Sequence, residues 1–208
     1  MFGKRSRLTV GAEKTLLTKQ YFSDEYKSII KERDKSFYNT NKSLLDNFSY
    51  VINKYTGDDY WCLNDFLREG KVQKFSKSEL KSWAYCLHSS LQFRTSNVEN
   101  NITVYRGVKL PAPKDWKVGK RFYFAEFIST SLNFNTAKEF AQRDDGSYGP
   151  ILVIKIKNNG VNGRNNYCRY VEEITKYHGE DEILITAFCI FQITGIDGNI
   201  YYLDCEGY

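Results

Sequence analysis

The chain has 208 residues, of which 41% are hydrophobic and 16% aromatic, and 30 Lys and Arg against 25 Asp and Glu give a net charge of +5. So many aromatic side chains exclude a disordered chain, because they bury enough apolar area to offset the entropy lost on folding. A mean hydropathy of −0.54, with no apolar run near the roughly 18 residues of a membrane span, excludes an integral membrane protein. We expect a single domain over residues 1–208.

The N-terminal segment has basic residues without the apolar core of about 7 to 15 residues that a secretory signal needs. We therefore expect no signal peptide and no membrane anchor, which leaves a cytoplasmic protein or a delivered or secreted effector as alternatives. Five widely spaced cysteines stand beside only two histidines, so we expect no bound metal, and the odd count favours reduced, buried thiols. The cysteines are Cys62, Cys86, Cys168, Cys189 and Cys205.

Residues 1–95 carry the spacing of helices. Apolar residues recur every three to four positions over 44–55, which predicts a helix with one buried face. A second short helix follows, with Asp58 or Asp59 as its N-cap, and Gly70 stands where a left-handed residue ends a helix.

A third helix is predicted after the capping box at 76–79. Over 101–208 the pattern changes to that of strands, separated by Gly, Asn and Asp turns. The predicted strands are 102–106, 121–128, 151–157, 182–187, 188–193 and 199–203. One helix interrupts them at 136–142, with Asn133 or Asn135 as its cap.

Helices first and strands later predict an α+β fold rather than alternating βαβ units, which disfavours a doubly wound nucleotide-binding domain. The motifs agree with this choice. The chain has no G-x-G-x-x-G and no phosphate-binding loop of the G-x-x-x-x-G-K type. It also lacks the G-x-S-x-G of serine hydrolases and the H-E-x-x-H of zinc proteases.

Three short motifs in the strand region carry residues suited to chemistry. Arg106 ends an apolar strand and is followed by Gly107, which would let the backbone approach a ligand. Three hydroxyl residues follow an aromatic strand at 129–131, and three acids precede an apolar strand at 180–182. Taken singly, these motifs are typical of an edge-strand arginine, a strand end and a solvated turn.

Taken in this order, the motifs resemble the Arg, Ser-Thr-Ser and Glu-x-Glu signature of the mono-ADP-ribosyltransferases. The chain resembles the actin-modifying enzyme components of clostridial binary toxins and, more loosely, the vertebrate arginine-specific ecto-enzymes. The likeness covers roughly residues 50 to 195. It implies N-terminal helices packed on a two-sheet mixed or antiparallel β core that encloses an NAD cleft, with a helical lobe over 1–95 and a β-rich lobe over 101–208.

The resemblance also implies which residues bind NAD, the co-substrate. On the adenosine side of NAD, the matching residues are Tyr55, Tyr60 and Asn64. Phe140 matches an aromatic that packs on nicotinamide, and Arg143 matches an arginine that holds a phosphate. The remaining predicted NAD-binding residues are Arg106, Gly107, Ser129, Thr130 and Ser131. The two arginines suit a pyrophosphate, because a planar and permanently charged fork binds it well. Some toxins of the family have a second arginine directly after the first. This chain has Gly107 there, and so do the ecto-enzymes, which changes the expected phosphate contacts.

Glu182 is the expected catalytic carboxylate. Breaking the bond between nicotinamide and ribose creates an oxocarbenium-like sugar, and nicotinamide leaves as a neutral molecule without a general acid. Glu182 would accept the ribose 2′-hydroxyl and stabilise positive charge at the anomeric carbon. Ser129 would hold Glu182 in place, while Thr130 and Ser131 would support the junction between strands.

Glu180 is expected to bind the acceptor. Residues i and i+2 of an extended chain point the same way, so Glu180 and Glu182 would face one cleft while Asp181 turns away. A guanidinium could then form a bidentate pair with Glu180, which would orient it and accept its proton. The resemblance implies arginine as the acceptor, since members with Gln here modify other groups, and it places Tyr177 against the protein substrate.

The resemblance thus implies an NAD:protein-arginine mono-ADP-ribosyltransferase with side NAD glycohydrolase activity, acting as a monomer with actin as a plausible target. Two alternatives remain. A related enzyme could modify nucleic acid, which the modest net charge of +5 does not favour. A catalytically silent binding module could share the fold, but such a module would not need Glu182 at the sugar.

Overall fold

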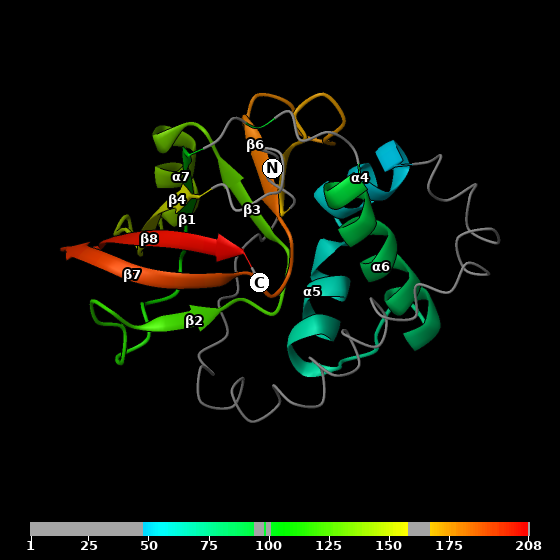
Figure 1. Ribbon diagram of the computed structural model, residues 1–208, viewed down its shortest axis with the longest axis horizontal. Helices are drawn as coiled ribbons and strands as arrows, with labels where there is room; N and C mark the ends of the chain where they lie inside the picture. Colours follow the sequence, from blue (N-terminus) through cyan, green and yellow to red (C-terminus); the bar gives the residue numbers. More distant parts are fainter. Residues whose placement is uncertain (1–47, 94–97, 99–100, 158–166, 208) are drawn as a thin grey trace.

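The computed structural model describes residues 48–93, 98, 101–157 and 167–207. Within these residues, the first elements are the helices α4 (Phe48–Thr56), α5 (Tyr60–Glu69) and α6 (Lys77–Phe93). They lie together on one side of the molecule, beside the sheet (Figure 1). The part of the predicted first helix at 44–47 lies outside the described residues.

Local signals set the ends of these helices. Gly70 adopts a left-handed conformation (φ 69°), and its N–H donates to the Phe66 carbonyl over 2.8 Å, as the glycine predicts. The capping box is confirmed, because Ser76 Oγ accepts from the Glu79 N–H at 3.3 Å and the Ser76 N–H donates to Glu79 Oε2 at 2.8 Å. Asp59 is the N-cap residue of α5, but its side chain makes no capping bond.

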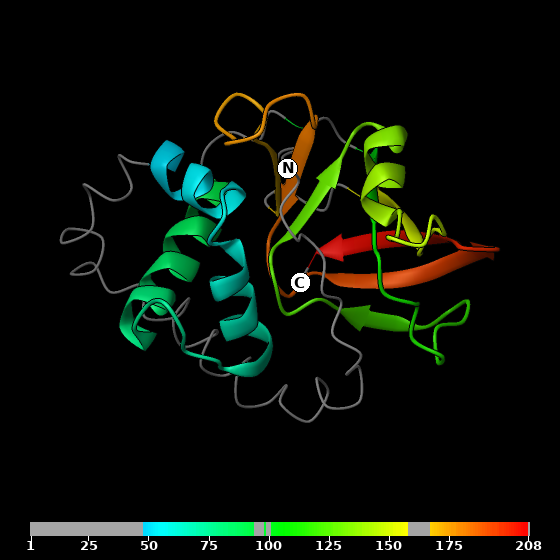
Figure 2. The ribbon, with the colours of Figure 1, turned by 180° about the vertical axis from the view of Figure 1, so that it is seen from behind.

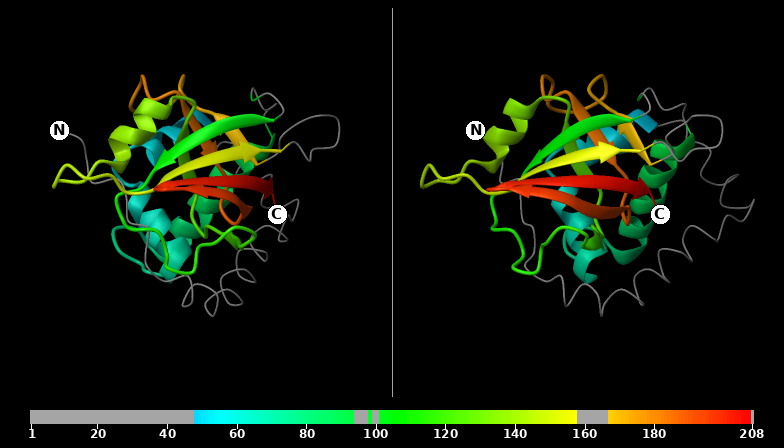
Figure 3. Two further views of the ribbon diagram at one scale, coloured as in Figure 1. Left: turned by 90° about the vertical axis from the view of Figure 1, so that its left-hand side faces the viewer. Right: turned by 60° about the vertical axis from the view of Figure 1, so that its left-hand side comes forward.

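The strand region forms one connected sheet in the described part of the chain. Its eight strands are β1 (Ile102–Gly107), β2 (Arg121–Tyr123), β3 (Ile128–Ser131), β4 (Ile151–Ile156), β5 (Cys168–Tyr170), β6 (Glu182–Ile185), β7 (Ile190–Asp197) and β8 (Ile200–Gly207). Their order is β2-β7-β8-β4-β1-β3-β6-β5, and only the β4–β8 pair is parallel. Figures 2 and 3 show β1, β4 and β8 side by side and β3 with β6 toward the helices.

The expectation of two separate sheets is corrected by this order. The sheet nevertheless narrows at one place, because β1 and β3 share only the register pair Tyr105↔Ser131. On one side of this seam lie β2, β7, β8, β4 and β1, and on the other lie β3, β6 and β5. The α+β class itself is confirmed.

The prediction of one continuous strand over 121–128 is wrong, because the chain forms two strands here, β2 and β3, with a break between them. In the break, the Phe124 carbonyl accepts from the Phe188 N–H at 2.8 Å, and Glu126 pairs with Arg68 of α5. These contacts belong to the tertiary structure and take this segment out of the sheet. The three hydroxyl residues at 129–131 consequently lie within β3 rather than after it.

The helix after β3 is α7 (Phe134–Ala141), and Asn133 is its N-cap, with its side chain accepting from the Asn135 N–H at 2.9 Å. The sequence missed the short strand β5, whose three residues are too few for a pattern. All five cysteines are buried. No helix of the described residues has the length and apolar character needed to cross a membrane.

The strand β6 lies between two hydrophobic clusters, and all four of its residues are buried. Ile183 and Ile185 pack into the cluster of the β core, whereas Leu184 packs into the cluster built by the helices. Because side chains alternate along a strand, Glu182 shares the helix-facing side with Leu184. The fold therefore directs Glu182 toward the boundary between the helices and the sheet.

Candidate functional site

Glu182 is the centre of the site. Its side chain is only 1% exposed, and the Ser129 hydroxyl donates to Oε1 while the Thr175 hydroxyl donates to Oε2 over 3.0 Å. In the ladder between β3 and β6, Ser131 faces Glu182 directly and Ser129 lies diagonally on the same side. A buried carboxylate needs such donors, because unpaired charge away from water is costly. The two hydroxyls therefore fix both oxygens of one carboxylate.

Arg106 reaches this site from across the seam. Its Nη1 donates to the Ser129 carbonyl over 2.7 Å, which links the end of β1 to β3. The buried Nε of Arg106 has no hydrogen-bond partner among the described residues. A half-buried guanidinium with an unused donor is chemically suited to an anionic ligand such as a pyrophosphate.

The other two hydroxyls of β3 hold the backbone around Glu182. The Thr130 hydroxyl donates to the Ile183 carbonyl at 2.7 Å, and the Ser131 hydroxyl donates to the Glu180 carbonyl at 2.5 Å. Ser131 Oγ also accepts from the Asn133 N–H at 2.9 Å, at the start of α7. Thr130 and Ser131 thus position main chain in this structure.

The geometry expected for Glu180 is corrected. Asp181 has a left-handed backbone (φ 48°), and Gly179 before the pair has φ 90°, so the chain is not extended between Glu180 and Glu182. The strand begins only at Glu182, and the two-residue alternation of a strand does not apply before it. Asp181 accepts a hydrogen bond from the Tyr170 hydroxyl at 3.3 Å. The half-buried Glu180 belongs to the loop that leads into the strand.

Glu172 braces this loop from within. Its carboxylate accepts from the Gly179 N–H and, at 3.3 Å, from the Glu182 N–H, while its carbonyl lies 3.0 Å from His178 Nδ1. Sequence reasoning missed both Glu172 and Thr175. Neither lies in a motif or at a periodic position, and only the folded loop brings them to Glu182.

Tyr177 lies on the outer side of the same loop. Its side chain is 38% exposed, and its hydroxyl donates to Asp58 Oδ1 over 2.7 Å. Lys176 Nζ lies 2.5 Å from the other Asp58 oxygen, and the Lys176 N–H donates to Thr56 Oγ1 at 3.0 Å. The loop is therefore attached to the turn between α4 and α5, and the Tyr177 ring remains accessible to a large molecule.

Tyr55, a predicted NAD contact, is buried between the helices and the sheet. Tyr55 is only 3% exposed, and its hydroxyl donates to the Phe127 carbonyl over 2.8 Å. The buried Asn64 donates to the Tyr55 hydroxyl at 3.0 Å. Burial raises the pKa of Tyr55 well above its ordinary value, so the phenol stays neutral and able to donate. Tyr60 is half-buried, with its ring edge-on to Tyr55.

Replacing Tyr55 with phenylalanine tests whether its hydroxyl stabilises the fold. The change leaves the buried Phe127 carbonyl without its donor, so we expect a loss of about 1 to 3 kcal/mol in the free energy of unfolding. Denaturant unfolding measures the loss. If Tyr55 instead acted as a ligand contact, the variant would keep its stability and lose affinity for the ligand.

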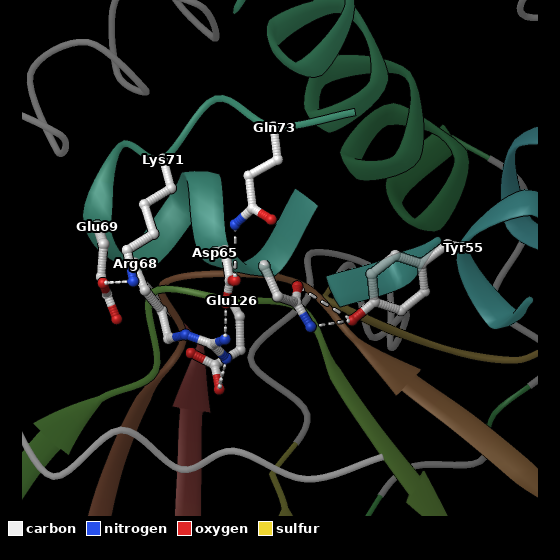
Figure 4. Close-up of polar contacts among 8 residues, drawn as sticks. Tyr55, Asp65, Arg68, Glu69, Lys71, Gln73 and Glu126 are labelled. Atoms are coloured by element: carbon white, nitrogen blue, oxygen red, sulfur yellow. Dashed lines mark hydrogen bonds and ion pairs between the residues drawn. The ribbon is translucent and has the colours of Figure 1, made fainter. Parts of the chain in front are cut away.

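A buried ion pair joins the helices to the segment between β2 and β3. Arg68 Nη1 lies 3.3 Å from Glu126 Oε1, and Nη2 lies 2.5 Å from Asp65 Oδ1 (Figure 4). Burial lowers the pKa of Arg68, but the carboxylates of Glu126 and Asp65 outweigh it and raise the pKa overall. The pair holds α5 against the segment that carries Phe127, next to Tyr55.

Gly107 stays a predicted ligand contact, and the structure shows a packing reason for a glycine there. A Cβ at this position would lie 1.8 Å from the Ala137 carbonyl oxygen and 2.6 Å from the Ala141 nitrogen, both in the backbone of α7. The space into which a Cβ of residue 107 would point is therefore filled by α7. Glycine is needed because helix and strand touch there.

Phe140 lies in the last turn of α7 and Arg143 follows the end of this helix, and both are half-buried. Arg143 Nε donates to the Lys109 carbonyl at 2.7 Å, and Nη1 donates to Ser147 Oγ at 3.2 Å. These bonds hold the guanidinium against neighbouring loops. Phe140 and Arg143 stay predicted ligand contacts.

Solved structures share this fold at low sequence identity. Vis toxin, an ADP-ribosyltransferase from Vibrio splendidus, is 19% identical with a TM-score of 0.57, covering 99% of this chain and 88% of that one. The ADP-ribosylating toxin BECa of a C. perfringens binary enterotoxin, solved with NADH, is 22% identical with a TM-score of 0.57, covering 91% and 48%. The eucaryotic mono-ADP-ribosyltransferase ART2.2 is 18% identical with a TM-score of 0.56, covering 94% and 87%.

These structures establish the fold. A search of curated proteins by sequence found no match. The model of the ADP-ribosyltransferase exoenzyme family, however, matches residues 32–201, which is most of the chain and includes Arg106, Ser129 and Glu182. This protein therefore belongs to the ADP-ribosyltransferase exoenzyme family.

Proposed function

We propose that the protein transfers ADP-ribose from NAD to an arginine of a target protein, with release of nicotinamide and a side activity of NAD hydrolysis. The observation that carries this proposal is the buried Glu182 carboxylate with a hydroxyl on each oxygen. A fold that uses two hydroxyls to hold one carboxylate at the boundary of helices and sheet is suited to stabilising positive charge. Arg106 stands beside it with an unused donor for the pyrophosphate of NAD.

In the first half of the reaction, the bond between nicotinamide and ribose breaks. Nicotinamide is a cation while bound to the sugar and leaves neutral, so the protein need not supply a proton. Positive charge then develops at the anomeric carbon, where the fixed negative charge of Glu182 lowers the energy of the transition state. Ser129 and Thr175 keep that charge in one orientation.

In the second half, a nitrogen of the acceptor guanidinium forms the new bond to the anomeric carbon and loses a proton. Glu180 is the proposed partner of this guanidinium and the acceptor of its proton. Two observations support this assignment. Glu180 lies on the loop attached beside Glu182, and the related Vis toxin was solved in complex with agmatine, a compound with a guanidinium group.

We propose that the acceptor is a protein, with actin as the first candidate, and that the enzyme acts as a monomer. The exposed Tyr177 supports a protein acceptor, since a rigid aromatic side chain beside the site offers contact area to a large partner. The likeness to a binary toxin component supports actin by analogy only. Labelled NAD, a cell lysate and mass spectrometry of the labelled band would identify the protein and the residue.

Replacing Glu180 with glutamine tests the assignment to arginine. The substitution keeps the shape of the side chain but removes the charge that pairs with the guanidinium, so transfer to agmatine should fall by about 100-fold or more. Hydrolysis of NAD depends on Glu182 and should stay within about threefold of the unaltered enzyme. Release of nicotinamide and formation of ADP-ribosyl-agmatine measure the two reactions in one mixture.

Full transfer to agmatine by the Glu180→Gln variant would overturn the assignment. Label in nuclease-sensitive material instead of protein would favour a nucleic-acid acceptor. An unaltered enzyme that binds NAD without releasing nicotinamide would be a silent binding module.

A further inference from the structure

We propose that Thr175 is a positioning residue for Glu182 and that it couples the acceptor loop to the carboxylate at the sugar. This inference rests on the proposed function, because it needs NAD cleavage at Glu182. Thr175 lies in the turn after β5, in the segment 171–181 that also carries Tyr177 and Glu180. We call this segment the acceptor loop.

The hydroxyl of Thr175 is built into the site. Its residue is 2% exposed, and Oγ1 donates to Glu182 Oε2 over 3.0 Å. The same oxygen lies 3.4 Å from the Tyr177 nitrogen and accepts its N–H. One hydroxyl thus bonds both the carboxylate of the proposed sugar site and the backbone of the acceptor loop.

The backbone places Thr175 there with little freedom. Val171 N–H donates to the Glu182 carbonyl at 2.9 Å, which continues the pairing of β5 with β6. The N–H groups of Ile174 and Thr175 then both donate to the Val171 carbonyl at 2.9 Å, which closes a tight turn. This turn returns the chain under Glu182 and presents the Thr175 side chain to its carboxylate.

The two hydroxyls on Glu182 come from different parts of the fold. Ser129 belongs to β3 and lies beside Arg106, so it fixes Oε1 from the sheet. Thr175 fixes Oε2 from the acceptor loop, whose next residue, Lys176, is attached to Thr56 at the end of α4 and to Asp58 in the turn after it. The orientation of the Glu182 carboxylate consequently depends on the position of the acceptor loop.

The position favours a role in catalysis over a role in stability alone. A buried threonine that only stabilised the fold could satisfy its hydroxyl by donating to a backbone carbonyl. Thr175 instead donates to an ionisable carboxylate. Removing the Thr175 donor loosens the restraint on rotation of the carboxylate about its terminal bond, a torsion with broad minima. The charge would then be misdirected at the developing sugar cation.

The test replaces Thr175 with valine, which keeps the shape and removes the hydroxyl. We expect kcat for NAD hydrolysis to fall by about 10- to 100-fold, as for the loss of a hydrogen bond to a charged group, with KM for NAD changed by less than about threefold. Thr175→Ser restores a hydroxyl and should recover most of kcat. Transfer to agmatine should fall in parallel with hydrolysis, because both need the same carboxylate.

Thr186→Val is the matched control. Thr186 is buried on the helix-facing side of the same chain segment, and its Oγ1 lies 2.8 Å from His88 Nδ1. The control loses a buried hydroxyl without touching Glu182, so it should lower the melting temperature and leave kcat nearly unchanged. Circular dichroism confirms that each variant is folded at the assay temperature.

Three results would overturn the inference: unchanged kcat in Thr175→Val, an equal loss in Thr186→Val, or no recovery in Thr175→Ser. Its failure is distinct from failure of the proposed function. NAD hydrolysis reports on Thr175 whatever the acceptor is, so an enzyme that hydrolyses NAD but ignores arginine would leave this proposal standing. An unaltered enzyme that does not release nicotinamide would overturn both.

Discussion

Replacing Glu182 with glutamine is expected to lower both NAD hydrolysis and transfer to arginine by about 1,000-fold. The side chain keeps its shape but loses the negative charge that stabilises the sugar cation. The fold should survive, because the hydroxyls of Ser129 and Thr175 can rotate to accept from an amide as well as donate to a carboxylate. Nicotinamide release measures the rate, and thermal melting checks the fold.

The comparison with Glu180→Gln sharpens this expectation. One variant should lose both reactions, while the other should lose only transfer, so the pair separates the breaking of NAD from the capture of the acceptor. Retention of either reaction by the Glu182→Gln variant at more than about a tenth of the normal rate would contradict the role assigned to this carboxylate.

Replacing Gly107 with alanine is expected to lower the free energy of unfolding by about 3 kcal/mol or more, at the upper end of overpacking effects. The added Cβ would lie 1.8 Å from a backbone oxygen of α7, and backbone cannot yield as a flexible side chain does. For a chain of this size the melting temperature should fall by about 6 to 12 °C. Thermal melting followed by circular dichroism measures the shift.

Gly195→Ala is the matched control in another strand of the sheet. A Cβ there would meet the side chain of Tyr202 at 3.3 Å, and that ring is exposed and can move aside. The control should shift the melting temperature by only a few degrees at most. Equal melting temperatures for the two variants would show that the close approach of α7 to Gly107 is wrong.

Features of the fold with local causes could be predicted from the sequence. The left-handed Gly70 and the capping box of Ser76 and Glu79 depend on bonds between residues close in the chain, and both are confirmed. The break at 124–127 could not be predicted, because bonds from Phe188 and Arg68, distant in sequence, create it. An apolar run carries no sign of such contacts.

In the candidate site, too, some features could be predicted from the sequence and others depend on contacts between distant residues. Arg106, Ser129 and Glu182 stand in motifs, and the structure brings them together. The left-handed Asp181 changes the geometry expected around Glu180, since a non-glycine residue gives little warning of positive φ. Gly107 and Tyr55 stay predicted ligand contacts, but only the structure shows their packing, with α7 against Gly107 and the Phe127 carbonyl at the Tyr55 hydroxyl.

The seam between β1 and β3 makes the site a bridge between two parts of a sheet that share a single register pair. Arg106 lies in the part of the sheet that ends at β1, and Glu182 lies in the part that begins at β3. The hydrogen bond from Arg106 to the Ser129 carbonyl connects the two parts. A small rotation of one part of the sheet relative to the other therefore changes the distance between Arg106, proposed to bind the pyrophosphate, and Glu182, proposed to bind the ribose. A dinucleotide bound to both residues would form a second connection between the two parts, and its length would set the angle between them.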